Sequence, residues 1–275
     1  MVDNDSFNSG SGQEECVRLL LAACHNKLQR DRRGRSAHHL AAMHGQVIVL
    51  GTLLGGSTKE INLPDCDGFT PLHYAAYNGQ EGTLDLLLQN ESCSATDDRI
   101  SQFTALHCAL VSGSEQCLQL LLSNSTAAVN SVDSAGFTPL HVAAAKNLLN
   151  SVKLLVSQGA RIDVKDNGNQ TPLMLAAKNG HVHVIEFLLE EKAEVELSDN
   201  EGNTALHFAC SNAMSKSANL LLKTASSELV SKQNYNGKTA LHLAAGQGLV
   251  ETTEILLGAG ASVTVTDTQV IFELN

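Results

Sequence analysis

The side chains best suited to catalysis or metal binding in this sequence are its 11 histidines and 7 cysteines. His181 and His183 could together bind a metal, and an activated thiol such as that of Cys108 or Cys210 could act as a nucleophile. No two cysteines have the CxxC spacing of a zinc or redox site, and their odd number does not suggest a disulfide framework. The cysteines therefore favour a reducing compartment.

Motifs that usually mark an enzyme are absent from the chain. It has no G-x-x-x-x-G-K-S/T phosphate loop, no H-E-x-x-H metal motif, no G-x-S-x-G serine elbow and no strand-led G-x-G-x-x-G loop. A simpler interpretation puts His181 at the start of a helix and makes Cys108 and Cys210 small buried side chains near alanines. We therefore expect no catalytic residue, no cofactor and no metal, and keep a small-ligand or catalytic protein as an alternative.

Charge and composition narrow the class of partner. Asp and Glu number 29 against 18 Lys and Arg, and the net charge of −11 argues against binding to a nucleic-acid backbone. Only 4% of the residues are aromatic, so Leu, Val and Ala must form the core, which favours helices. No apolar run is long enough to span a membrane, and residues 1–12 lack the pattern of a signal peptide. We expect a protein of the cytoplasm, and also of the nucleus, without membrane insertion.

A tetrad similar to Thr-Pro-Leu-His recurs seven times along the chain. Its last residues lie 34, 34, 34, 33, 33 and 35 positions apart; they are His39, His73, His107, His141, Met174, His207 and His242. Asp-x-x-Gly precedes most of the tetrads, and an apolar segment with a leucine-rich end follows. The period predicts seven repeats, which start near residues 31, 65, 99, 133, 166, 199 and 234.

Each repeat carries the signals of two short helices and a loop. The Thr of the tetrad can cap a helix, and Pro71, Pro139 and Pro172 then stand at the first helical position, where a proline needs no N–H. A break such as Asn78-Gly79 separates this helix from a second one. Two such helices cannot bury their own apolar faces, so neighbouring repeats must stack. The predicted fold class is all-α, a solenoid of helix-turn-helix units joined by finger loops.

The motif T-P-L-H-x-A, present at residues 70–75 and 138–143, resembles the signature of the ankyrin repeats. The resemblance covers residues 31–266 and implies an ankyrin repeat solenoid with β-hairpin fingers. It also implies that the six tetrad histidines are structural and form hydrogen bonds with the backbone of neighbouring fingers. Four residues depart from the pattern, and we expect distorted fingers near them: His38, Arg99, Gln102 and Met174.

The two ends of the repeat array look incomplete. Residues 14–30 resemble only the second helix of a partial N-terminal repeat, behind a disordered tail at residues 1–13. Residues 267–275 follow the start of a new finger but show no tetrad, and we expect a truncated or frayed C-terminus there. The chain is thus expected to be a fragment or truncated form of a longer array.

Partner binding is implied, by the same resemblance, in a concave groove lined by finger tips and by the exposed part of the first helices. Counted from the first residue of each finger, Phe69, Phe103 and Phe137 all occupy position five, roughly 10 Å apart at ordinary helix spacing. Such a strip beside a basic end would suit a partner segment with apolar anchors and acidic residues. The alternative is that each Phe packs on its neighbouring finger. The candidate groove residues are Arg32, Arg33, Arg35, Phe69, Tyr77, Phe103, Val111, Phe137 and Lys146.

Two finer resemblances concern modification and identity. The sequence around Asn62 resembles finger sequences modified by the asparaginyl hydroxylase that acts on hypoxia-inducible factor; the alternative is a finger Asn that satisfies local backbone. Residues 129–147, 170–180, 200–212 and 256–267 resemble late repeats of the regulatory ankyrin repeat subunits of serine/threonine-protein phosphatase 6. That resemblance implies a non-catalytic scaffold that joins the phosphatase to targets. The competing interpretation is a general adaptor, which links a membrane protein tail or a signalling protein to another complex.

Overall fold

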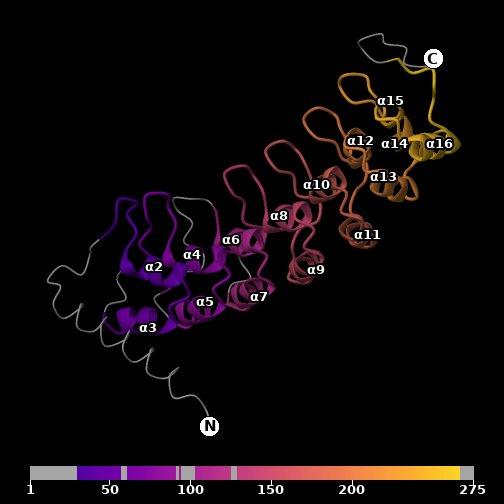
Figure 1. Cartoon of the computed structure of the whole chain (residues 1–275). Helices are drawn as coiled ribbons and strands as arrows, with labels where there is room; N and C mark the ends of the chain where they lie inside the picture. Colours follow the sequence, from indigo (N-terminus) through magenta and orange to yellow (C-terminus); the bar gives the residue numbers. More distant parts are fainter. Residues whose placement is uncertain (1–29, 57–60, 91–92, 94–102, 125–128, 267–275) are drawn as a thin grey trace. The chain divides into compact units, whose positions relative to one another are not determined.

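A computed structural model describes residues 30–56, 61–90, 93, 103–124 and 129–266, which form 15 helices and contain no β-strand (Figure 1). The predicted all-α class is therefore confirmed. The chain divides into two compact units, an N-terminal unit at Met1–Ser134 and a C-terminal unit at Ala135–Asn275. The predicted tail at 1–13, the partial repeat at 14–30 except its last residue, the segment 267–275, and the departures Arg99 and Gln102 lie outside the described residues.

Helices of the N-terminal unit form two layers. The first helices of its repeats are α2 (Ala37–Met43), α4 (Pro71–Tyr77) and α6 (Ala105–Ser112), and the second helices are α3 (Val47–Gly56), α5 (Glu81–Leu88) and α7 (Glu115–Asn124). Helix α4 packs between α2 and α6, and α5 packs between α3 and α7. Like elements of neighbouring repeats thus stack on one another, as the period predicts.

The C-terminal unit repeats this arrangement with one addition. Its first helices are α8 (Pro139–Ala145), α10 (Pro172–Asn179), α12 (Ala205–Ser211) and α15 (Ala240–Gly246), and its second helices are α9 (Leu149–Ser157), α11 (Val182–Glu190), α13 (Ser215–Leu222) and α16 (Val250–Gly258). The short helix α14 (Ser227–Ser231) lies where the tetrad spacing rises to 35. Its N-terminus is capped by the Ser226 hydroxyl, which accepts the backbone N–H of Leu229 at 3.0 Å.

Threonine and proline begin the first helices as predicted. Pro71, Pro139 and Pro172 stand in the first turn of α4, α8 and α10. In α6, which has no proline, the Thr104 hydroxyl accepts the backbone N–H of His107 at 3.5 Å. The local sequence therefore sets the start of each first helix, before any packing is considered.

Alanine and leucine form the core of each unit. Ala75 and Ala76 of α4 are fully buried, as are Ala143 and Ala144 of α8, and these small side chains let adjacent first helices approach closely. Leucines such as Leu87 of α5 fill the space between the layers, and a fully buried leucine stabilises a fold by about 1.5–3 kcal/mol. Helices as short as the 7 residues of α4 are marginal alone, so stacking is what stabilises them.

In five of the fingers, one side chain at the base holds the loop. In the second finger, Oδ1 of Asp65 accepts the backbone N–H groups of Asp67 and Phe69, each at 2.9 Å. The same pair of bonds recurs in four other fingers, at Asp31, Asp166, Asp199 and Asn234. A backbone hydrogen bond also joins successive fingers, as between the N–H of Cys66 and the carbonyl of Arg33 at 2.9 Å.

Two fingers that the sequence predicted to be distorted are regular. In the finger before Met174, Oδ1 of Asp166 accepts two backbone N–H groups at 2.8 and 2.7 Å, and the finger before His38 keeps the equivalent bonds to Asp31. Met174 is buried, and its sulfur accepts the backbone N–H of Thr171 at 3.5 Å in place of an imidazole nitrogen. The prediction was wrong because the carboxylate holds the finger, so a change in the tetrad leaves the loop intact.

Candidate protein-binding surface

Tetrad histidines connect a first helix to the finger of the next repeat. The backbone N–H of Ser36 donates to Nδ1 of His39, and that of Thr138 donates to Nδ1 of His141, each at 3.1 Å. Nδ1 therefore carries no proton, and the proton lies on Nε2. Nε2–H donates to a position-five carbonyl in three repeats: His39 to Phe69 at 3.0 Å, His141 to Gln170 at 3.0 Å and His207 to Lys238 at 3.2 Å. The implied structural role is confirmed for these three.

Burial keeps the imidazoles of His39 and His207 neutral. Burial lowers the pKa of His39 to about 4, and it also lowers the pKa of His207. A second proton on His39 would have to sit on Nδ1, where it would face the N–H of Ser36. His39 and His207 therefore act as hydrogen-bonding groups, with no acid or base role at neutral pH.

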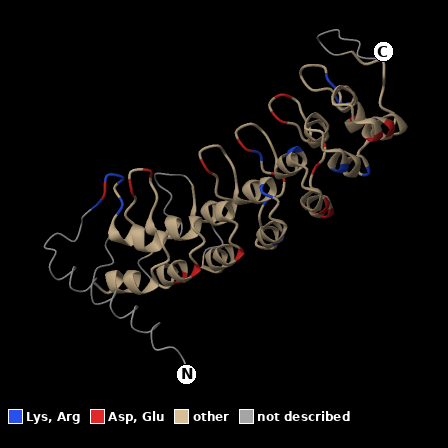
Figure 2. Ribbon diagram, viewed as in Figure 1, with Lys and Arg blue, Asp and Glu red and all other residues tan. Residues whose placement is uncertain are grey.

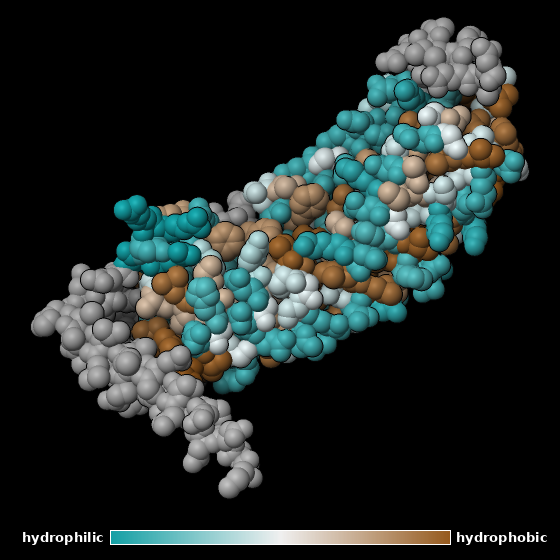
Figure 3. All heavy atoms as spheres, viewed as in Figure 1, coloured by the Kyte–Doolittle hydropathy of each residue, from teal (hydrophilic) through white to brown (hydrophobic). Residues whose placement is uncertain are grey.

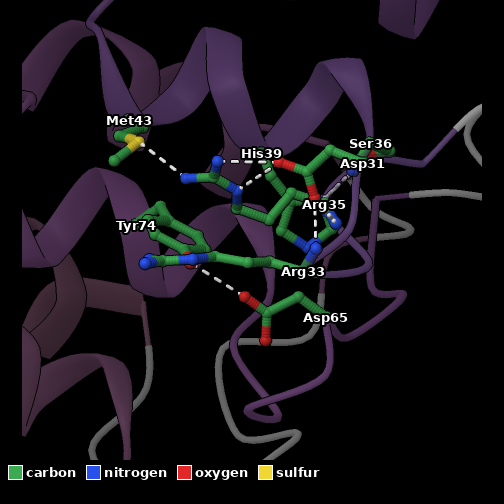
Figure 4. Close-up of polar contacts among 8 residues, drawn as sticks. All are labelled: Asp31, Arg33, Arg35, Ser36, His39, Met43, Asp65 and Tyr74. Atoms are coloured by element: carbon green, nitrogen blue, oxygen red, sulfur yellow. Dashed lines mark hydrogen bonds and ion pairs between the residues drawn. The ribbon is translucent and has the colours of Figure 1, made fainter.

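All Lys and Arg residues in the described part of the N-terminal unit lie in or next to its first finger (residues 31–35) (Figure 2); they are Arg30, Arg32, Arg33 and Arg35. Arg35 is half-buried and paired: its Nε and Nη2 lie 2.8 and 2.7 Å from Oδ2 of Asp31, and its Nη1 lies 3.7 Å from the sulfur of Met43 (Figure 4). Hydrogen bonding by Arg35 lowers the pKa of Asp31. Arg32 and Arg33 are exposed, so a partner can reach their side chains.

Beside this finger, Phe69 and Phe103 form an aromatic pair, and both rings are half-buried. Their centroids lie 6.4 Å apart, and each ring also contacts its own tetrad histidine, Phe69 to His73 at 5.7 Å and Phe103 to His107 at 5.2 Å. The rings are closer than the predicted 10 Å because they lean toward each other across the repeat spacing, into the range that aromatic pairs favour. In Figure 3 the first finger is strongly hydrophilic, and less hydrophilic side chains adjoin it.

Tyr74 of α4 completes the aromatic group around Phe69. Its ring centroid lies 6.0 Å from that of Phe69, and its hydroxyl donates to Oδ2 of Asp65 at 2.8 Å (Figure 4). Burial raises the pKa of Tyr74 to about 12, so this hydroxyl keeps its proton and its hydrogen bond. The sequence analysis did not count Tyr74 among the groove residues, although its place four residues after the tetrad Thr puts it beside position five.

The remaining predicted groove residues are distributed over both units. Tyr77 is 48% exposed and Val111 is half-buried in the N-terminal unit. Phe137 and Lys146 belong to the C-terminal unit, where the half-buried Phe137 ring lies 5.6 Å from the ring of His141 and Lys146 is exposed. Seven of the nine predicted residues therefore lie in the N-terminal unit.

Asparagine side chains connect the fingers of the C-terminal unit. Nδ2 of Asn200 donates to the carbonyl of Asn167 at 3.1 Å, and Nδ2 of Asn234 donates to Oδ1 of Asn203 at 2.8 Å. Asn169 also donates to the side chain of Asn200. The exposed ring in these fingers is that of Tyr235, which is 75% exposed.

The cysteine and histidine side chains considered for catalysis or metal binding are buried or bonded within the chain. Cys108 and Cys210 are buried, and burial raises both thiol pKa values, that of Cys210 to about 12. His181 pairs with the carbonyl of Ala145 at 2.9 Å through Nε2, whereas His183 lies 3.2 Å from Glu186. Within the described ranges, no three His, Cys, Asp or Glu residues gather closely enough to hold a metal. Over the same part of the chain, no helix has both the length and the apolar character to cross a membrane.

Comparison with known proteins identifies the class. The family model for ankyrin repeats (three copies) matches residues 7–98, 83–166 and 161–230, and the single ankyrin repeat model matches residues 236–268. The chain belongs to the ankyrin repeat family. Ankyrin repeat domains are generally non-catalytic modules for protein–protein interaction. The chain is therefore an interaction scaffold.

Individual similar proteins say little about the partner of this chain. Among solved structures, the crystal structure of the human ASB11 ankyrin repeat domain is similar, with 27% identity and a TM-score of 0.71 over 83% of this chain and 99% of that chain. Because 591 solved chains match, this likeness identifies the fold and leaves the partner open. No curated protein matches the sequence.

Proposed function

We propose that the first finger and the aromatic pair of the N-terminal unit bind a segment of a protein partner. The observation that carries this proposal is the pairing of two half-buried rings, Phe69 and Phe103, with two exposed arginines, Arg32 and Arg33. Aromatic residues and arginine are enriched in the buried centre of interfaces, and they dominate binding energy. The tetrad histidines, Tyr74 and the contact between the two rings bury part of the pair, and a partner would contact its exposed part.

A matched pair of variants tests this surface. Co-purification is quantified for the wild type, for Phe69→Ala combined with Phe103→Ala, and for Phe208→Ala in the C-terminal unit. Partners that bind at the aromatic pair should be lost from the double variant and retained by the Phe208 variant. Thermal unfolding of each variant shows whether the fold is intact. Equal recovery of all partners by a folded double variant would contradict the proposal.

As the wider role, we propose a regulatory or targeting subunit of a protein phosphatase 6 type complex. The support is the resemblance of residues 129–147, 170–180, 200–212 and 256–267 to late repeats of such subunits. Recovery of the phosphatase 6 catalytic subunit with the chain would support this role. Its absence, together with other constant partners, would favour the general adaptor. We also propose a cytoplasmic location with a nuclear fraction, which imaging of the tagged chain would test.

We separately propose that Asn62 is a site of asparagine hydroxylation. It is half-buried and follows the buried Ile61, three residues before the base of the second finger. The acidic residue of the resembling motif, Glu60, lies outside the described residues. Mass spectrometry of the peptide that contains Asn62 should show an added oxygen in normoxic cells and less of it in hypoxic cells. An unmodified peptide in both conditions would remove the proposal.

A further inference from the structure

Resting on the proposed function, we infer that the N-terminal unit recognises an extended acidic peptide segment. In this arrangement carboxylates of the segment meet Arg32 and Arg33. An apolar side chain of the same segment, about three residues away, packs against the aromatic pair. The inference names the chemistry of the partner, which the family alone does not supply.

Contacts within the chain decide which arginines are available to bind a partner. Among the described residues of the N-terminal unit, positive charge is confined to residues 30–35. Two of the four arginines are engaged within the chain, because Arg35 pairs with Asp31 and Nη1 of Arg30 donates to the carbonyl of Pro64 at 2.9 Å. Arg32 and Arg33 are exposed neighbours, and guanidinium groups bind carboxylates through paired hydrogen bonds. An acidic segment is the complementary partner.

The backbone of the first finger is already fixed in place. Oδ1 of Asp31 accepts the N–H groups of Arg33 and Arg35, each at 2.9 Å, and the carbonyl of Arg33 accepts the N–H of Cys66 at 2.9 Å. Binding at this finger would therefore order only the side chains of Arg32 and Arg33. A preorganised backbone lowers the entropy lost on association.

The spacing follows from the repeat. The aromatic pair begins one repeat after the first finger, and neighbouring repeats lie about 10 Å apart. An extended chain advances about 3.3 Å per residue, so about three residues separate the acidic and apolar side chains of the segment. The hydroxyl of Tyr74 beside the pair is satisfied by Asp65, which leaves an apolar surface for the anchor.

Asp67 fixes which end of the segment is acidic. It is exposed and occupies position three of the second finger, the position that Arg33 occupies in the first. A carboxylate placed at the second finger would be repelled by Asp67, whereas one placed at the first finger meets two arginines. The acidic end should therefore lie over the first finger and the apolar anchor over the rings.

Selection from a random peptide library displayed on phage tests the inference on the full chain. The expected sequences carry Asp or Glu with an aromatic or large aliphatic residue about three positions away. A synthetic copy of the strongest peptide, with a fluorescent label, then reports affinity by anisotropy. Arg32→Glu with Arg33→Glu should weaken binding about tenfold or more and remove its dependence on salt. The matched reversal Lys216→Glu with Lys223→Glu, at exposed sites of the C-terminal unit, should leave affinity within about twofold.

Cys66 reports where the peptide lies, because it is exposed and its backbone is bonded to Arg33. The peptide should slow alkylation of Cys66, measured by mass spectrometry of the peptide that contains it. Asp67→Asn should raise affinity for the same peptide about twofold to threefold, since it removes a nearby negative charge.

Three results would overturn the inference: no enriched peptide, selected peptides without acidic residues, or equal affinity of the wild type and the arginine double variant. These results are distinct from failure of the proposed function. A partner that depends on Phe69 and Phe103 but is indifferent to Arg32 and Arg33 keeps the surface and removes only the acidic partner. A partner indifferent to both pairs removes the surface itself.

Discussion

The fingers of the two units stack in the same way but use their side chains differently. In the C-terminal unit Asn200, at position two of its finger, donates to the preceding finger, and so does Asn234, at position one of the next finger. In the N-terminal unit position two carries Arg32 and Cys66, and both are exposed. A polar side chain bonded to a neighbouring finger contributes to stability, whereas the exposed Arg32 and Cys66 side chains can contact a partner. These contacts stabilise the C-terminal fingers, whereas the proposed partner surface lies on the N-terminal fingers.

The rings of the two units show the same contrast. Phe69 and Phe103 face each other across two repeats of the N-terminal unit. In the C-terminal unit Nζ of Lys178 lies 5.7 Å from the centroid of the Phe208 ring, so a cation already occupies one face of that ring. A ring covered by its own chain has less surface to offer a partner.

The largest expected effect concerns pH and the tetrad. The pKa of His39 is about 4 in the folded chain against 6.5 for an unperturbed histidine, so the unfolded chain binds more protons between these values. The contribution of His39 to the free energy of unfolding is therefore fully present above pH 6.5. It falls by about 3 kcal/mol as the pH drops toward 4. His39→Met, the residue that the C-terminal unit uses at Met174, should remove this part of the loss. Urea unfolding at pH 7.5 and 4.5, followed by circular dichroism, measures the difference.

Equal pH dependence of the wild type and the His39→Met variant would show that the imidazole does not titrate on unfolding. At pH 7.5 the variant should itself be less stable, because it loses the hydrogen bond from Nε2 to the Phe69 carbonyl. The substitution thus lowers stability at pH 7.5 but reduces the loss of stability at pH 4.5, so the two effects can be separated.

The second-largest expected effect is on partner binding by the aromatic pair. Phe69→Ala with Phe103→Ala should weaken partner binding by about 2 kcal/mol or more, as expected of buried interface anchors. Phe208→Ala, in the C-terminal unit, should change binding by less than about 0.5 kcal/mol. Isothermal titration with the purified partner measures both. A larger effect at Phe208 would reverse the assignment of the two units.

Amide side chains of the C-terminal fingers give a smaller effect on stability. Asn200→Ala should lower the unfolding free energy by about 1 kcal/mol, through loss of its bond to the Asn167 carbonyl, and should leave partner binding unchanged. Cys66→Ala, at the same position of the N-terminal unit, should change stability by less than about 0.5 kcal/mol. Chemical denaturation of both variants tests whether the bond between fingers matters as the structure indicates.

Backbone strain gives the smallest expected effect. Ala213 has φ 58° at the turn between α12 and α13, where Gly79 has φ 65° in the second repeat. An L side chain is strained in this region, so Ala213→Gly should raise stability by about 0.5 kcal/mol, after allowance for the extra freedom of glycine in the unfolded chain. Gly79→Ala should lower stability by about 1 kcal/mol. Thermal unfolding that ranks the two in the opposite order would contradict the strain argument.

Much of the fold could be predicted because its signals are local and repeated. The threonine caps, the prolines of the first turn and the alanine-rich first helices act within a few residues, and seven in-phase copies make the period unmistakable. The distorted finger expected near Met174 was an error for a related reason. Most repeats carry both a tetrad histidine and a finger aspartate, so the sequence does not show that the aspartate alone holds the loop.

The candidate site was predictable only as a set of positions. Numbering within the repeat places Phe69 and Phe103 at one position, but the side-chain torsions that bring their rings to 6.4 Å depend on both fingers being in place. The sequence does not distinguish the four arginines at residues 30–35. In the folded chain Arg35 pairs with Asp31, and Arg30 donates to the carbonyl of Pro64. Which charges remain available is therefore a property of the folded finger.

The amino-acid order alone determined the repeat, its helix boundaries and the absence of common catalytic motifs, because each depends on residue type at fixed spacing. Tertiary structure decided the tautomer of the histidines, the approach of the aromatic rings, and the division of arginines and asparagines into bonded and exposed groups. These features depend on hydrogen bonds and ring contacts between residues about 30 positions apart, such as that from His39 to the carbonyl of Phe69. Only stacking of one repeat on the next brings such groups within bonding distance.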